Sequence, residues 1–152
     1  MDQFIDFLPL IMTIIGIVVS IVLSGVGSSR GASLVGKAAA ALISEQPEKF
    51  GQALVLQMMS ASQGLYGFIV GFLIFINISD NMAFELGLRC LGAGLLMGLA
   101  GYLTAIQQAS IATAGIQILA KKPEHSTKGV LFSAMIETYA IFAFVVSVLI
   151  VL

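Results

Sequence analysis

The stretch Gly129–Leu152, GVLFSAMIETYAIFAFVVSVLIVL, determines how this sequence has to fold. It is long enough for one membrane crossing, because a spanning helix needs about 20 apolar residues. Glu137 is the only charged residue in the stretch. A carboxylate at such depth is costly unless it is protonated, paired or bound to a cation. Glu137 is therefore the first candidate for a functional site.

The composition of the whole chain indicates a membrane protein. Hydrophobic residues make up 59% of it and charged residues 10%, with a mean hydropathy of +1.05. A soluble chain of this length could not bury so many apolar groups. The net charge of −1 gives no indication of nucleic acid. A single cysteine, Cys90, excludes an internal disulfide and a cysteine-based metal site, so no transition metal is expected.

Four hydrophobic stretches follow one another along the chain. They cover about residues 8–27 (with helical character continuing through 38–43), about 50–78, about 83–119 and about 129–152. Helices are expected, because lipid cannot satisfy free backbone groups and strand-like alternation is absent. The short connectors predict antiparallel neighbours. The sequence thus predicts an all-α membrane protein with four transmembrane helices, paired as hairpins over residues 1–80 and 81–152.

The two hairpins have the pattern of a tandem duplication. The segment SEQPEKF at positions 44–50 corresponds to AKKPEH at positions 120–125, so that position n of the first copy matches position n + 76 of the second. At this offset Ala61 corresponds to Glu137, so only the second hairpin has the acid. Both copies run in the same direction, unlike the inverted repeats of many secondary transporters.

The distribution of charge predicts an orientation. Basic residues lie in or beside the first and third connectors, namely Lys49, Lys121, Lys122 and Lys128. The middle connector has Asp80 and Glu85. This bias predicts a multi-pass protein of the cell membrane with connectors 44–50 and 120–128 in the cytoplasm and both termini outside. Because the first residues include Asp2 and Asp6 rather than basic residues, we expect no cleaved signal peptide.

Counting from the connector prolines places three polar residues at one depth. Glu137 follows Pro123, Gln108 precedes it, and Gln63 follows Pro47. Each of the three lies roughly four helical turns from its proline, so their levels agree to within about one turn. Three helices therefore deliver a carboxylate and two amides to one layer of the membrane.

Oxygen ligands of this kind suit a small alkali cation. On the second helix Met59, Ser62 and Tyr66 share a face with Gln63. We expect Na⁺ to be bound by Glu137, Gln108, Gln63, Ser62 and the main-chain carbonyl of Met59, with Tyr66 donating a hydrogen bond to Glu137. Two alternatives stay open: a protonated Glu137 that carries H⁺, and glutamines that serve only as interhelical hydrogen bonds, worth about 0.6 kcal/mol each.

With these residues in view, the chain resembles a known family. Its most specific segments are QPEKFGQAL at 46–54, QGLYGF at 63–68, AGIQILAKKPEH at 114–125 and IETYAI at 136–141. Together with the duplicated hairpin and its one surviving acid, they resemble the proteolipid (c or K) subunit of V-type rotary ATPases, particularly the sodium-pumping bacterial ones. Two features depart from that pattern: Ser62, where threonine is common, and the segment MMSAS at 58–62, which lacks a proline found near Ser60 in some relatives.

The resemblance implies a homo-oligomeric ring of identical subunits in the membrane. The first and third helices would line its inside, and the second and fourth would carry the ion sites outside. In sodium-pumping members the site uses the positions that match the proposed ligand set, with Tyr66 supporting the glutamate. The family also implies a stator subunit that bears an arginine, a central-stalk subunit, and ATP hydrolysis elsewhere, since this chain has no nucleotide site.

Other charged residues receive less specific interpretations. Arg30 precedes Pro47 by roughly four to five helical turns, close to the level of Glu137. It is either an internal counter-ion of Glu137 or, as we prefer, a contact for lipid phosphates inside the ring together with Lys37. The connectors are expected either to be merely solvated or to face the central stalk. The connector residues in question are Glu48, Lys49, Lys121, Lys122 and His125.

Two other functions remain as rivals. A small multidrug exporter also uses one membrane glutamate in a four-helix chain, but it needs an aromatic cavity, and this chain has no tryptophan. In a purely structural tetraspan, Glu137 would have no function. Neither rival explains the parallel repeat or the amides at the depth of the acid.

Overall fold

The protein is a bundle of long helices. The computed structural model describes residues 2–79 and 82–152, with side chains from Phe7 onward. Its helices are α1 (Asp2–Glu45), η1 (Pro47–Lys49), α2 (Phe50–Met59), α3 (Ser62–Phe75), α4 (Phe84–Lys121), η2 (Pro123–His125) and α5 (Ser126–Val151). The prediction of an all-helical chain is confirmed. The predicted boundary between hairpins, at residues 80 and 81, lies outside the described residues.

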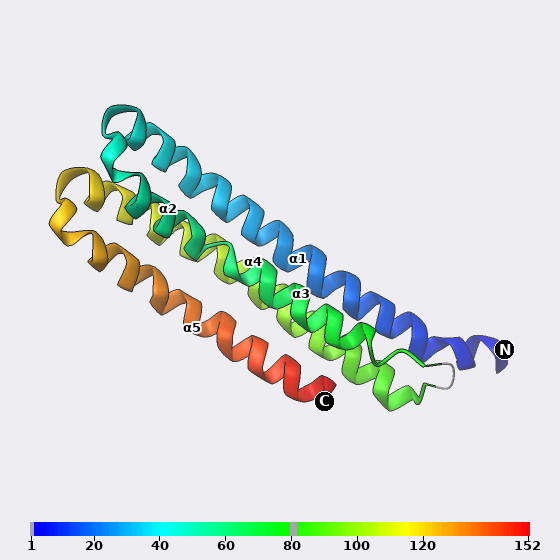
Figure 1. Cartoon of the computed structure of the whole chain (residues 1–152). Coiled ribbons are helices and arrows are strands. Elements are labelled where there is room, and N and C mark those ends of the chain that lie inside the picture. The colour runs from blue at the N-terminus through cyan, green and yellow to red at the C-terminus, as the bar shows by residue number, and fades with distance from the viewer. Residues whose placement is uncertain (1, 80–81) are drawn as a thin grey trace.

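The helices lie side by side, with the α1–α2 and α4–α5 connectors at one end and both termini at the other (Figure 1). Three helices among the described residues are long and apolar enough to cross a membrane. The pair α2 and α3 forms a fourth span if its two segments are taken together. The chain is therefore a membrane protein of three to four spans, as the hydrophobic stretches predicted.

Burial in this bundle differs from that in a soluble protein, although some large apolar side chains such as Leu56 are buried too. Large apolar side chains such as Phe72, Phe142 and Leu149 lie exposed on the outside. Small and polar side chains such as Ser20, Ser24 and Gln108 are fully buried between helices. Lipid is as apolar as leucine, so helices associate through close packing and hydrogen bonds rather than by burying large apolar groups.

Glycines set the close contact between α1 and α4. A Cβ on Gly16 would lie 2.5 Å from the carbonyl oxygen of Cys90, and a Cβ on Gly94 would overlap the backbone of Gly16. Only residues without a side chain let the two backbones approach this closely. This contact brings α4, which carries Gln108, against α1 and beside the second span.

The second span is broken, which the sequence did not predict. Helix α2 ends at Met59 and α3 begins at Ser62, with a bend of 41° between them. No proline occurs there; instead Ser60 Oγ donates to the Gln57 carbonyl and Ser62 Oγ to the Met59 carbonyl. Such serine hydroxyls compete with the helix for its carbonyl groups.

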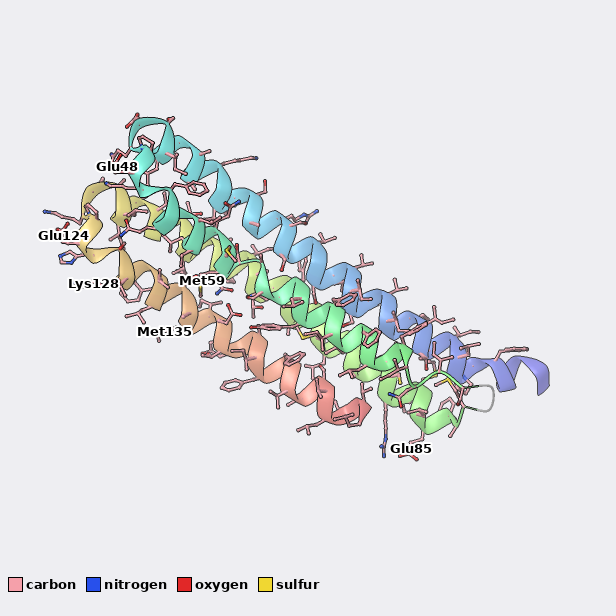
Figure 2. All side chains as sticks on the ribbon, viewed as in Figure 1. Glu48, Met59, Glu85, Glu124, Lys128 and Met135 are labelled. Carbon is pink, nitrogen blue, oxygen red and sulfur yellow. The ribbon has the colours of Figure 1, made fainter. Side chains whose placement is uncertain are left out.

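The break is stabilised from another helix. The amide N–H of Gly64 donates to the hydroxyl of Ser28 on α1 over 2.7 Å. Backbone groups near a break in a membrane helix need such partners, because lipid supplies none. Met59, the last residue of α2, lies between the two ends of the bundle in Figure 2. Glu48 and Glu124 mark one end and Glu85 marks the other.

Candidate ion-binding site

Glu137 accepts hydrogen bonds on both carboxylate oxygens. It lies on α5 and is half-buried. The hydroxyl of Tyr66 on α3 donates to Oε1 over 2.7 Å, and Nε2 of Gln108 on α4 donates to Oε2 over 2.7 Å. Hydrogen bonds to an ionised group are among the stronger ones in proteins. Three helices thus converge on one carboxylate within the bundle.

Gln108 links the carboxylate to the rest of the site. Its side chain is fully buried, and its Nε2 also donates to the main-chain carbonyl of Ser133, 3.2 Å away on α5. Its Oε1 accepts from Nε2 of Gln63 on α3. The two amides and the carboxylate form one continuous chain of hydrogen bonds across α3, α4 and α5.

Gln63 leaves an oxygen without a partner. The side chain is fully buried, and its Oε1 has no hydrogen-bond donor among the described residues. A buried polar atom without a partner costs about 1–3 kcal/mol. Such an atom in a native fold calls for an explanation, and an unobserved ion is one of the usual ones. Gln63 therefore offers an oxygen that a cation could use.

Ser62 and Met59 lie at the helix break beside Gln63. The Ser62 hydroxyl is 3.1 Å from the Met59 carbonyl oxygen and donates to it. Both groups are oxygens, and both residues are only half-buried. The break thus adds a hydroxyl and a main-chain carbonyl at the point where the second span passes Gln63.

The structure therefore brings together the residues on which the ion hypothesis depends. The hydrogen-bonded group comprises Glu137, Gln108, Gln63 and Tyr66, with Ser62 and Met59 adjacent along the chain. Two further residues escaped the sequence reasoning. The Ser133 carbonyl orients Gln108. Ser133 lies one helical turn before Glu137, and this spacing could have placed it near the site. Ser28 supports the break, and no local pattern indicated it.

Arg30 has its hydrogen bond outside this group. Its Nη1 donates to the hydroxyl of Tyr102 on α4 over 2.8 Å, and its guanidinium lies 5.9 Å from the centre of that ring. Its partner is thus Tyr102 rather than Glu137. Arg30 and Lys37 both lie exposed on α1, and their contact with lipid stays a prediction.

The first and third connectors lie at the same end of the bundle, where Figure 2 labels Glu48 and Glu124. Glu48, Lys121, Lys122 and His125 are exposed. Lys49 differs, because its Nζ donates to the carbonyls of Leu119 and Ala120 at the end of α4, over 3.0 and 3.1 Å. That ammonium group caps a helix inside the chain, where a positive charge complements the helix dipole.

Comparison with known proteins agrees with the repeat. A family model for the C subunit of ATP synthase matches residues 14–74 and again residues 91–150. The K subunit of the V-type sodium ATPase of Enterococcus hirae is 52% identical over 143 residues, which are 94% of this chain and 92% of the relative. The K subunit of the A-type ATP synthase of Methanocaldococcus jannaschii is 38% identical over 93% of this chain and 62% of its own length.

A more distant similarity extends to a eukaryotic protein. The 16 kDa proteolipid of the V-type proton ATPase of Rattus norvegicus is 24% identical over 86% of this chain and 84% of its own. The double match confirms the predicted duplication, and the resemblance predicted from the quoted segments is confirmed by the same comparisons. The chain belongs to the family of the ATP synthase C subunit.

Proposed function

We propose that this chain is a rotor-ring subunit of a V-type ATPase and that it carries Na⁺ across the membrane at Glu137. The family supports a ring subunit, and the relative named as part of a V-type sodium ATPase supports Na⁺. The observation that carries the proposal is the buried Gln63 Oε1, which lacks a partner among the described residues. The ion is cargo, bound on one side of the membrane and released on the other.

The ligand set follows from the positions of the oxygens. Na⁺ is held by the Glu137 carboxylate, the Oε1 atoms of Gln108 and Gln63, the Ser62 hydroxyl and the Met59 carbonyl. Gln108 presents Nε2 to Glu137 and Oε1 to the Gln63 amide nitrogen, so both amides turn over when the ion binds. Without a cation that turn would place two oxygens against each other. The orientation of the Gln108 amide therefore depends on loading.

Sodium accounts for the site better than a proton does. A proton alone neutralises the carboxylate, and the resulting carboxyl O–H group needs only one hydrogen-bond acceptor. A proton therefore gives no reason for two buried amides, one of which has an oxygen with no donor among the residues that the structure describes. Proton transport at the same glutamate remains the alternative, and relatives named as proton ATPases lie within the same family similarity.

Transport follows from the charge of the site. A loaded site is neutral and can pass through lipid as the ring turns, among exposed apolar residues of α5 such as Met135 and Phe142. An emptied Glu137 is anionic and stays beside an arginine of the stator subunit, which displaces the ion and blocks leakage. Each unit charge moved against a potential of about 100 mV stores about 2.3 kcal/mol, supplied by ATP hydrolysis in another subunit.

The remaining parts of the proposal concern orientation and partners. Connectors 44–50 and 120–128 face the cytoplasm, where they meet the central stalk, and both termini lie outside. Arg30 and Lys37 face lipid inside the ring. Residues 1–80 and 81–152 act as two repeats. A multidrug exporter or a structural tetraspan would leave the parallel duplication unexplained, so we favour neither.

Carbodiimide labelling of the assembled ring tests the function. The reagent attacks a protonated carboxyl, so an ion bound at Glu137 shields it. We expect Na⁺ to block labelling while the same concentration of K⁺ does not, and Glu137→Gln to abolish labelling at this position. Labelling that responds to pH and ignores Na⁺ would establish the proton alternative. Labelling that ignores both would remove Glu137 from the transport site.

A further inference from the structure

The Tyr66 hydroxyl reaches Glu137 from the far end of a long side chain. Its position therefore depends on what holds the ring, because a group in a binding site keeps its geometry only where packing fixes its rotamer. The ring of Phe144 lies against that of Tyr66, with 5.2 Å between the ring centres and 33° between the ring planes. This separation lies within the range of attractive aromatic pairs. Phe144 thus contacts the ring that carries the hydrogen-bond donor.

Phe144 and Glu137 lie on the same side of the same helix. Phe144 follows Glu137 by seven residues on α5, which is about two helical turns. One helix therefore supplies both the oxygen that accepts the Tyr66 hydroxyl and the ring that packs on the phenol. Tyr66 and Phe144 also pack against one buried cluster, which includes Val70 and Met97. The Tyr66 side chain is thus held at its ring by Phe144 and at its hydroxyl by Glu137.

The packing between α3 and α5 opens beside this aromatic pair. Phe144 also lines an open groove of about 330 Å³. The residues that line the groove are apolar and come from α3 and α5, namely Ile69, Leu73, Phe144, Val145, Val148 and Leu149. Phe144 is common to the groove and to the contact with Tyr66. The groove therefore leaves apolar space next to the ring that holds Tyr66.

A second aromatic pair, on the exposed side of α5, provides a contrast. Phe142 lies edge-on to Tyr139, with 6.5 Å between the ring centres, and the two side chains are 65% and 64% exposed. Phe144 and Tyr66 are both half-buried. Two phenylalanines of one helix thus have different surroundings: Phe142 faces outward, and Phe144 packs on the tyrosine that contacts Glu137.

We propose that Phe144 is a positioning residue of the ion site: its ring holds the Tyr66 phenol in the orientation in which the hydroxyl donates to Glu137. Phe144 has no oxygen to offer a cation, so it acts on Na⁺ through Tyr66. The hydroxyl leaves Glu137 when the Phe144 ring moves into the groove and the Tyr66 ring follows it. Phe144 thereby sets how tightly the site holds Na⁺ and how fast it releases the ion. This inference rests on the proposed function and adds to it a residue that is not an ion ligand.

Protection of Glu137 from carbodiimide by Na⁺, in the assembled ring, measures this role. Phe144→Leu removes the aromatic ring and keeps an apolar side chain. Because an aromatic pair contributes beyond the area that it buries, half-protection should require about 2- to 10-fold more Na⁺. Labelling after rapid dilution of Na⁺ should also begin sooner than in the parent ring. Phe144→Tyr keeps the aromatic ring and should restore the parent values.

The matched control is Phe142→Leu, the same substitution on the same helix. The Phe142 ring packs against Tyr139 rather than on the tyrosine of the site, so we expect the parent Na⁺ protection. A Phe142→Leu ring that loses as much protection as Phe144→Leu would overturn the proposal, because any aromatic ring of α5 would then have the same effect.

A double-mutant cycle with Tyr66→Phe separates positioning from packing. Tyr66→Phe leaves no hydroxyl to orient, so adding Phe144→Leu to it should change half-protection by less than about 2-fold. An equal loss in both backgrounds would show that Phe144 acts by packing alone and would overturn the proposal. A loss that occurs only where the Tyr66 hydroxyl is present supports it.

The results also separate this inference from the proposed function. A parent ring whose labelling ignores Na⁺ overturns the proposed function and this inference with it. A parent ring that Na⁺ protects, together with a Phe144→Leu ring that needs no more Na⁺, overturns the inference alone. Native mass spectrometry establishes that each variant assembles. If Phe144→Leu forms no rings, Phe144→Met takes its place under the same criteria, because an unbranched methionine adapts to irregular gaps.

Discussion

Replacing Gln63 with methionine separates two roles of its side chain, ion ligand and interhelical hydrogen bond. Methionine has a similar volume and no hydrogen-bonding amide. Gln63→Met removes the hydrogen bond from Nε2 to Gln108 and the unpartnered Oε1. An ion ligand predicts weaker Na⁺ binding after this substitution, whereas a purely interhelical role predicts an unchanged Na⁺ affinity.

The energies in the structure give the size of each effect. Without Na⁺ the substitution removes one unpaired buried oxygen but leaves the buried Oε1 of Gln108 without its donor, and these two costs of about 1–3 kcal/mol each offset one another. What remains is the loss of a hydrogen bond worth about 0.6 kcal/mol in a membrane. Ring stability without Na⁺ should therefore stay equal or fall slightly. With Na⁺ one ligand is lost, and interactions with charged groups are worth about 1.5–3 kcal/mol. Binding should weaken roughly 10- to 150-fold, at about 1.4 kcal/mol per tenfold change.

Two measurements on the same preparation check this prediction. The Na⁺ concentration that half-protects Glu137 from carbodiimide gives affinity, and the dissociation temperature of the ring in Na⁺-free detergent gives stability. Gln57→Met is the control, because Gln57 lies on the same span and donates to the Ala32 carbonyl over 3.4 Å, away from Glu137. An unchanged Na⁺ affinity would refute the ligand role, whatever the stability of the ring, and would leave Gln63 with an interhelical hydrogen bond as its function.

Three further changes have defined outcomes. Tyr66→Phe removes the donor to Glu137, a hydrogen bond to a charged group worth about 1.5–3 kcal/mol, so Na⁺ protection should require at least about tenfold more Na⁺. Ser28→Ala leaves the Gly64 amide without its partner at the break and should destabilise the fold by about 1–3 kcal/mol, measured by thermal unfolding. Lys49→Ala removes the cap on α4 and should lower stability by about 0.3–1 kcal/mol in the same assay.

Each of these changes has a matched control. Tyr139→Phe alters an exposed tyrosine of α5 and should leave Na⁺ protection unchanged. Ser29→Ala alters an exposed serine that donates to the Val26 carbonyl of its own helix, and Lys122→Ala removes an exposed lysine of the connector. If a control variant changed the measured property as much as its test variant does, the specific role assigned to Tyr66, Ser28 or Lys49 would be contradicted.

Much of the fold was predictable because membrane spans are local features of the sequence. The four stretches were expected close to their observed ends at the connectors, since prolines and charges mark those ends. The expected second helix over residues 50–78 was wrong in one respect, the break at Ser60–Ala61. Its stabilising contact comes from Ser28 on a different helix, and no local pattern indicates it.

The depth of the candidate site was also accessible from sequence. Counting along helices gave one level for Glu137, Gln108 and Gln63, because the rise per residue of a helix is fixed by its backbone. Two other properties depend on which helices pack together: the direction in which each side chain points from its helix, and the group to which that side chain hydrogen-bonds. Sequence counting therefore left Arg30 as either a counter-ion of Glu137 or a lipid contact, and the structure shows its bond to Tyr102.

The sequence by itself determined that this protein spans a membrane, that its hairpin is duplicated and that one acid lies among amides at a common depth. These properties follow from composition, spacing and the fixed geometry of a helix. Only the tertiary structure decided that the buried Oε1 of Gln63 has no hydrogen-bond donor within the described part of the chain, and that Ser28 supports a broken helix. Those properties depend on contacts between distant segments, whose energies no stretch of sequence contains alone.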